Sequence, residues 1–83
     1  MKLVFLGRFR DIAGSHLSDI SLPGDVANLS GLRDWLTKTE PDLAQALAGA
    51  RTQYAVNRTI VRDLAHPIRD SDEIAFLPPM SGG

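Results

Sequence analysis

The sequence predicts a single α+β domain in which a mixed sheet of about five strands packs against one to two helices. Strand-like segments lie near both ends of the chain, and two segments with helical spacing lie between them. The apolar runs at residues 3–6 (LVFL) and 74–77 (IAFL) are continuous, which predicts two neighbouring central strands with both faces buried. We expect residues 1–77 to form the domain and residues 78–83 to form an extended tail.

The first third of the chain is expected to supply two strands. Residues 2–7 are rich in β-branched and aromatic side chains and predict the first strand. Residues 7–14 (GRFRDIAG) contain glycine at both ends and are expected to form a connection. The spacing of aliphatic side chains over residues 17–22 predicts a second strand, and the Pro-Gly-Asp sequence at residues 23–25 predicts the turn after it.

The middle of the chain predicts two consecutive helices. Asn28 is suited to cap the first helix, although Gly31 inside that helix costs roughly 1 kcal/mol relative to alanine. Pro41, followed by an acidic first turn, predicts the start of the second helix, and Gly49 predicts its end. The apolar faces of the two helices consist of Leu29, Leu32, Trp35, Leu36, Leu43, Ala44 and Leu47.

The last third is expected to return to strands. Residues 53–57 (QYAVN) predict a strand, Arg58 and Thr59 a two-residue turn, and residues 60–61 the returning strand. The acidic sequence at residues 70–73 (DSDE) is interpreted as a solvated turn that leads into the final strand.

The two apolar strands imply that one face of the sheet is left for a partner. Alternation along a strand sends successive side chains to opposite faces. If Leu3, Phe5, Ile74 and Phe76 face the helices, the opposite face carries Val4, Leu6, Ala75 and Leu77. Ile60 is expected to join this second set. Because the helices cover only one face, we expect a partner protein to cover the other.

Composition excludes several classes of function. The net charge of −1 and the pI near 6.0 argue against nucleic-acid binding, which usually requires a basic surface. The chain has no cysteine, and His16 and His66 lack the spacing of metal ligands, so no metal site is predicted. The apolar run at residues 3–6 is too short for a signal peptide or a membrane span, so we expect a cytoplasmic protein without membrane association. We find no catalytic cluster and expect no self-contained active site.

The C-terminal tail contains the most unusual sequence, PPMSGG. Pro78 and Pro79 cannot continue a hydrogen-bonded strand and favour an extended exit from the sheet. Six extended residues reach roughly 20 Å. Gly82 and Gly83 have no side chains, so a narrow channel can admit them and a nucleophile can approach the terminal carbonyl. We therefore interpret the terminal carboxylate of Gly83, once activated, as the reactive group.

The whole chain resembles the small subunits of molybdopterin synthase, the MoaD-type sulfur carriers with a ubiquitin-like β-grasp fold. The resemblance is clearest in AVNRTIV (residues 55–61), HPIRDSDEIAFLPPMSGG (residues 66–83) and RDIAG (residues 10–14). It implies that a MoeB-type, ubiquitin-activating-like enzyme adenylates Gly83 with ATP, and that a sulfur donor converts the adenylate into a thiocarboxylate. The chain itself is expected to bind no cofactor.

The same resemblance implies the partner and its contacts. The tail, with Pro78, Pro79, Met80, Ser81 and Gly82 ahead of Gly83, would enter a MoaE-type large subunit and donate sulfur to cyclic pyranopterin monophosphate, within a heterotetrameric synthase. Two transfers would build the dithiolene of molybdopterin, and the chain would act as a sulfur donor that is not an enzyme by itself. The partner-facing hydrophobic side chains of this family align with Leu6, Ile60 and Leu77.

Three other functions remain open from the residues alone. The chain could be a sulfur carrier for thiazole synthesis, tRNA thiolation or cysteine synthesis. It could be a ubiquitin-like modifier whose Gly83 forms isopeptide bonds, or a β-grasp interaction module with an inert terminus. The sequence does not identify the activating enzyme, the sulfur donor or the stoichiometry of the assembly.

Overall fold

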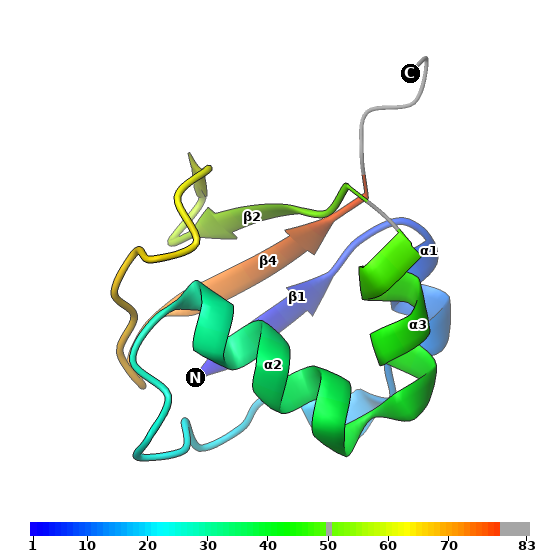
Figure 1. Cartoon of the computed structure of the whole chain (residues 1–83), viewed down its shortest axis with the longest axis horizontal. Helices are drawn as coiled ribbons and strands as arrows, with labels where there is room; N and C mark the ends of the chain where they lie inside the picture. The colour runs from blue at the N-terminus through cyan, green and yellow to red at the C-terminus, as the bar shows by residue number, and fades with distance from the viewer. Residues whose placement is uncertain (50, 79–83) are drawn as a thin grey trace.

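The computed structural model describes residues 1–49 and 51–78. Within these residues the chain forms three α-helices, one 3-10 helix and one sheet (Figure 1). In chain order the elements are β1 (Lys2–Phe5), α1 (Arg8–Ile12), η1 (Ser15–Leu17), α2 (Leu29–Thr39), α3 (Pro41–Gly49), β2 (Gln53–Val56), β3 (Thr59–Val61) and β4 (Glu73–Leu77).

The sheet is mixed and has the strand order β1-β4-β2-β3. The first and last strands lie side by side and run parallel, with Leu3 opposite Ile74 and Phe5 opposite Phe76. Strand β4 also pairs antiparallel with β2, and β2 forms a hairpin with β3. The prediction that the two continuous apolar runs are neighbours is therefore confirmed, although β4 is central whereas β1 lies at the end of the strand order.

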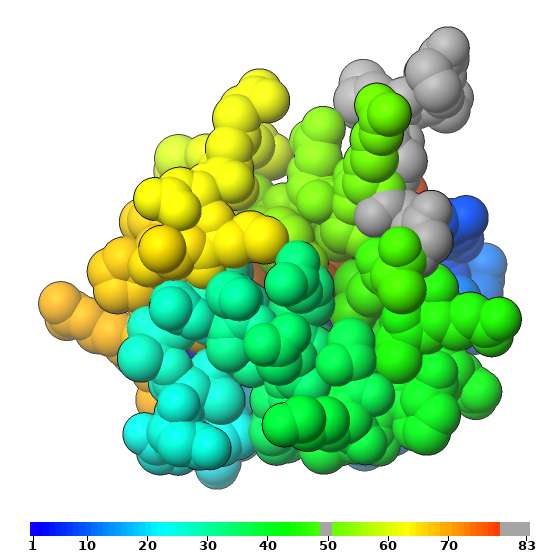
Figure 2. All heavy atoms as spheres, in the orientation of Figure 1, coloured from blue at the N-terminus to red at the C-terminus, as the bar shows by residue number. Residues whose placement is uncertain are grey.

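Helices α2 and α3 form a layer over one face of this sheet, toward the viewer in Figures 1 and 2. Phe76 of β4 is fully buried between the layers, where its ring stacks on Phe5 at 4.8 Å and meets Tyr54 edge-on at 5.5 Å between ring centroids. The helices contribute fully or almost fully buried leucines to the same core: Leu29, Leu32, Leu36, Leu43 and Leu47. This layering confirms the predicted α+β class and agrees with the β-grasp fold that the resemblance implies.

The start of α2 follows the prediction closely. The Asn28 side chain accepts a hydrogen bond from the Gly31 N–H at 2.8 Å, which satisfies one of the free donors of the first turn. A Cβ atom on residue 31 would lie 3.2 Å from this same Asn28 oxygen. The glycine therefore gives the capping side chain its space, which offsets its unfavourable helix propensity.

The predicted strand over residues 17–22 is wrong, so the sheet of the described residues has four strands and not about five. Leu17 belongs instead to the 3-10 helix η1, which carries its side chain into the core. Only one bridge, between Asp19 and Lys2, joins the following segment to β1. The Ile20 N–H still donates to the Met1 carbonyl at 2.9 Å, whereas the Leu22 N–H donates to the Asp70 carboxylate at 2.7 Å. Pro23, the next residue, has no N–H to donate.

The connection predicted over residues 7–14 contains a short helix that the sequence did not reveal. Helix α1 spans Arg8–Ile12 and buries Phe9 completely, close to α3 and β1. Its five residues form little more than one turn, which is too short to display a helical repeat of apolar side chains. Among the described residues, no helix is long and apolar enough to cross a membrane.

Candidate functional site

The face of the sheet opposite the helices carries a continuous row of apolar side chains. Val4 of β1 lies opposite Ala75 of β4, Ala75 lies opposite Ala55 of β2, and Ala55 lies opposite Ile60 of β3. Residues paired directly across strands point to the same face. We call this side of the sheet the open face. It includes this row and the neighbouring side chains that point the same way, among them Gln53 and Leu77.

Three aliphatic side chains give the open face its apolar character. Leu6 is 41% exposed and Ile60 is 46% exposed, and Leu77 is half-buried. By contrast, Leu3 and Ile74, which alternate with them along β1 and β4, are 2% and 0% exposed beneath the helices. The assignment of the two faces by alternation is therefore correct. Whether Leu6, Ile60 and Leu77 bind a partner stays a prediction.

The position of Ile60 depends on a hairpin turn that lies one residue earlier than the sequence predicts. The turn consists of Asn57 and Arg58, whose φ angles are 50° and 72°, and not of Arg58 and Thr59. Asparagine tolerates a positive φ because its short side chain can hydrogen-bond to nearby backbone. A turn at Arg58 and Thr59 would have paired Ile60 with Asn57, whereas the observed turn pairs it with Ala55, in the centre of the apolar row.

One end of the open face is polar and tied together by side chains. Glu73 approaches both Lys2 and Arg58 at 3.6 Å. Asn57 donates to the Asp72 carboxylate at 2.9 Å and accepts from the Glu73 N–H at 2.9 Å, which joins the β2–β3 hairpin to the start of β4. The Asn57 hydrogen bond is the main cause that holds the pKa of Asp72 below its usual value of 3.8.

The acidic turn before β4 therefore has a structural role that its interpretation as a solvated loop missed. Asp70 accepts hydrogen bonds from the Leu22 N–H at 2.7 Å and from the Met1 amine at 3.3 Å. The backbone donor is the main cause that lowers the pKa of Asp70 below 3.8, and the amine lowers it further. These bonds connect Met1 and the loop at Leu22 to the turn that precedes β4.

The other end of the open face is the point where the chain leaves the sheet. Leu77 ends β4, and the half-buried Pro78 follows it. Gly7, at the end of β1, has a φ angle of 59°, and a Cβ atom there would lie 2.6 Å from Cγ of Pro78. Gly7 is thus required twice, for its backbone conformation and for the space that the proline ring occupies.

The remaining predicted tail residues, Pro79, Met80, Ser81, Gly82 and Gly83, lie outside the described residues. Their predicted roles, and the tail boundary at residue 78, therefore stay predictions. Within residues 1–49 and 51–78, no group of three or more histidine, aspartate or glutamate side chains is arranged to bind a metal ion. The described geometry is an exposed apolar sheet face next to the point where the chain leaves the sheet.

Comparison with known proteins shows the same similarity over the full length. Residues 3–83 match the model of the ThiS family. The chain is 31% identical over 83 residues to the molybdopterin synthase sulfur carrier subunit of Escherichia coli (strain K12), covering 100% of this chain and 99% of that protein. It is 30% identical over 83 residues to the protein of the same name from Haemophilus influenzae, with the same coverage. It is 29% identical over 84 residues to that of Chlamydomonas reinhardtii, covering 100% of this chain and 98% of the relative.

Proposed function

Because the chain belongs to the ThiS family, we propose that it is the sulfur-carrier small subunit of a molybdopterin synthase. The observation that carries this proposal is the similarity to three molybdopterin synthase sulfur carrier subunits, which extends over essentially the whole of each protein. A match of this extent includes both the open face and the Gly-Gly terminus. The activity of the chain is therefore that of a sulfur donor within a two-protein enzyme.

The chemistry takes place at the carboxylate of Gly83. One carboxylate oxygen attacks the α-phosphorus of ATP on a ubiquitin-activating-type (MoeB-type) enzyme, and pyrophosphate leaves. A sulfur nucleophile then attacks the acyl-adenylate and displaces AMP, and the product is the thiocarboxylate. Nothing bulky stands beside Gly83 to obstruct either attack. Sulfur passes from the thiocarboxylate to cyclic pyranopterin monophosphate, and water cleaves the bond between that sulfur and the Gly83 acyl carbon, which restores the carboxylate. Two such transfers complete the dithiolene of molybdopterin.

The large (MoaE-type) subunit is the partner that this function requires, and we assign it to the open face. Leu6, Ile60 and Leu77 present aliphatic surface there, close to the end of β4 where the tail begins. A partner that covers these side chains is in position to receive the tail. We further propose a heterotetrameric assembly and a cytoplasmic location, as the resemblance to this family implies.

The decisive experiment separates a reactive terminus from an inert one. The intact chain is incubated with its activating enzyme, ATP and a sulfide source, and mass spectrometry should detect replacement of one terminal oxygen by sulfur. Deletion of Gly83 withdraws the reactive carbon by about 3.5 Å. Since a misplacement near 1 Å can cost about 100-fold in rate, the deleted chain should form no molybdopterin at a measurable rate while its melting temperature stays unchanged.

A second variant has one alanine added after Gly83. It keeps every native residue and should also be inactive, because the terminal carboxylate no longer belongs to Gly83. A Gly83-deleted chain that supports molybdopterin formation at the intact rate would rule out the proposed function. A chain that accepts sulfur but supports no molybdopterin formation with the large subunit would indicate a carrier for a different pathway.

A further inference from the structure

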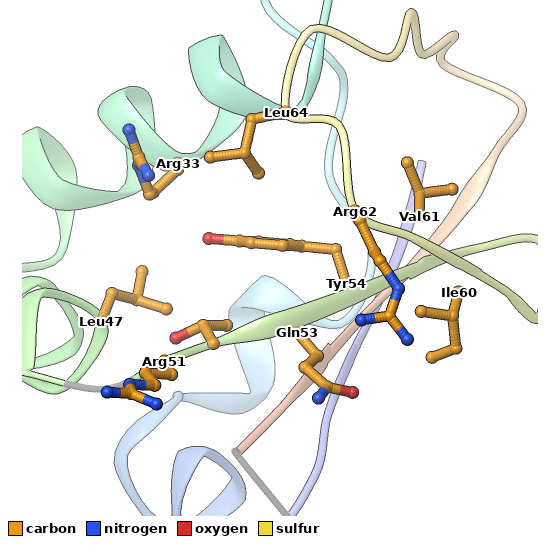
Figure 3. A pocket seen from close by; sticks show the side chains of 10 residues that line it. Arg33, Leu47, Arg51, Gln53, Tyr54, Ile60, Val61, Arg62 and Leu64 are labelled. Carbon is orange, nitrogen blue, oxygen red and sulfur yellow. The ribbon is translucent and has the colours of Figure 1, made fainter.

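A pocket of ≈ 390 Å³ lies beside the outer strand β3, between the edge of the sheet and the helical layer. Figure 3 shows the Tyr54 ring in the middle of it, extending from β2 toward the side of Arg33 on α2 and Leu47 on α3. Leu64 lies over the ring, and Ile60 and Arg62 lie beyond its base. This volume is at the lower end of the range of pockets that hold small ligands or large side chains.

The charged residues that line the pocket are all arginines. Arg33, Arg51 and Arg62 take part, and no aspartate or glutamate is among the lining residues. Arg33 approaches the exposed Asp34 at 3.9 Å, which is a weak surface pair. In the part of the chain that the structure describes, Arg51 and Arg62 are exposed and form no ion pair. The pocket therefore carries positive charge in a chain whose net charge is −1.

Two hydroxyl groups add hydrogen-bond donors to these cations. Among the described residues, the Thr52 Oγ1 atom is buried without a hydrogen-bond partner, and Thr52 lines the pocket. Buried hydroxyls normally have a partner, so this one retains its capacity to form a hydrogen bond. Burial raises the pKa of Tyr54, while the charge of Arg33 acts in the opposite direction. The Tyr54 hydroxyl is protonated at neutral pH, as tyrosine normally is, so it too can donate.

Part of the pocket wall is apolar, and two of the lining residues also belong to the open face. Leu47, Val61 and Leu64 supply aliphatic surface around the tyrosine ring. Gln53 and Ile60 line the pocket and also belong to the open face, since Gln53 is paired with Leu77 and Ile60 with Ala55. A protein that covers the open face as far as Gln53 and Ile60 therefore reaches the pocket.

We propose that this pocket receives an acidic side chain of the same partner protein that covers the open face. Arginine binds carboxylates with paired hydrogen bonds, and the hydroxyls supply further donors. The aliphatic part of the wall accommodates the methylene groups of the acidic side chain and apolar side chains next to it. This inference rests on the proposed function, because it takes the large subunit as that partner. Its consequence is that the carrier is held by two kinds of contact, apolar on the open face and ionic beside β3.

The test measures binding of the full chain to the purified large subunit by calorimetry at low and high sodium chloride. The pocket variant is Arg51→Glu/Arg62→Glu, in which both substituted side chains are exposed, so the fold should tolerate the change. We expect its affinity to fall by about tenfold or more at low salt, with a weaker dependence on salt than the intact chain. Lys38→Glu is the matched control, because Lys38 is exposed on the last turn of α2 and does not line the pocket.

Two further arms separate the possible failures. Leu77→Asp reports on the open face alone. If it weakens binding while the pocket variant binds like the intact chain, the inference is overturned and the proposed function stands. If the intact chain does not bind the large subunit, the proposed function and the inference fall together.

The last arm titrates the isolated chain with inorganic phosphate and follows the Tyr54 and Thr52 amide signals by NMR. Saturation at low millimolar phosphate would show a site for a small anion and would overturn the assignment to a partner side chain.

Discussion

Replacing Gly7 with alanine should slow sulfur transfer far more than it destabilises the fold. Gly7 has φ 59° and ψ −137°, a conformation that costs a residue with a side chain about 1–3 kcal/mol. Each kcal/mol lowers the melting temperature of a domain of this size by roughly 4–8 °C. The variant should therefore melt at least about 4 °C lower than the intact chain and still be folded at 25 °C.

The effect on transfer comes from the contact between the new Cβ and Pro78. That Cβ would lie 2.6 Å from Cγ of the proline, whereas carbon atoms in contact are about 3.5–4.0 Å apart. The ring must move by roughly 1 Å, and with it the first residue of the tail. A misplacement of this size at a reacting group can cost about 100-fold in rate. We expect a loss of this order in the single-turnover rate of thiocarboxylate-charged chain at saturating large subunit.

The matched control is Gly24→Ala, because a Cβ at residue 24 meets no atom within 4 Å. It should leave the transfer rate unchanged and should not lower the melting temperature. Adding Pro78→Ala to the Gly7→Ala chain removes the Cγ atom that clashes, so it should restore part of the rate without restoring the melting temperature. A Gly7→Ala chain that melts lower but transfers sulfur at the intact rate would refute the idea that this contact sets the path of the tail.

Five other substitutions test the core, the open face and the acidic turn. Phe76→Ala should lower the free energy of unfolding by about 3–5 kcal/mol in urea titration, because its ring is fully buried, and Phe5→Ala should cost less because that ring is half-buried. Leu77→Asp and Leu6→Asp should keep the circular dichroism spectrum of the isolated chain but weaken its binding to the large subunit; unfolded variants would show that these side chains belong to the core. Asp70→Asn should remove part of the acid sensitivity: the folded pKa of Asp70 is lowered, so its stabilisation is present above about pH 4 and is lost as the pH falls through that folded pKa. The difference in melting temperature between the two chains should shrink toward pH 2, and a constant difference would contradict this origin.

The elements that the sequence predicted well are those with a strong local signal. Helix α2 has both a capping asparagine and a repeated leucine stripe, and the parallel neighbours β1 and β4 are two unbroken apolar runs. Helix α1 was missed because its stability depends on one buried side chain, Phe9, and on no repeat. The strand expected at residues 17–22 failed because the Leu17 and Ser18 N–H groups close a 3-10 turn with Gly14 and Ser15, which the spacing of the aliphatic side chains does not predict.

Parts of the candidate site could also be predicted from local sequence, and other parts could not. Alternation along β1 and β4 was enough to place Leu6 and Leu77 on the open face, because period two is a property of the strand itself. The row of Ile60 depends on the hairpin turn, and the positive φ angles of Asn57 and Arg58 are not evident from residue types without a glycine. The arginine pocket could not be predicted, since α2, α3, β2 and β3 all contribute to it and only the tertiary fold brings these elements together.

The parallel pairing of β1 with β4 also determines when the domain can form. Lys2 lies opposite Glu73, so the parallel pairing of β1 with β4 joins residues 71 positions apart in the chain. Helices α2 and α3 and the β2–β3 hairpin join residues that are close in sequence and can form early, whereas closing a loop of this length is entropically costly and slow. During synthesis the apolar side of β1 must therefore wait for nearly all of the chain to leave the ribosome. Strand β4 pairs with both β1 and β2, so the sheet stays incomplete until residues 73–77 are available.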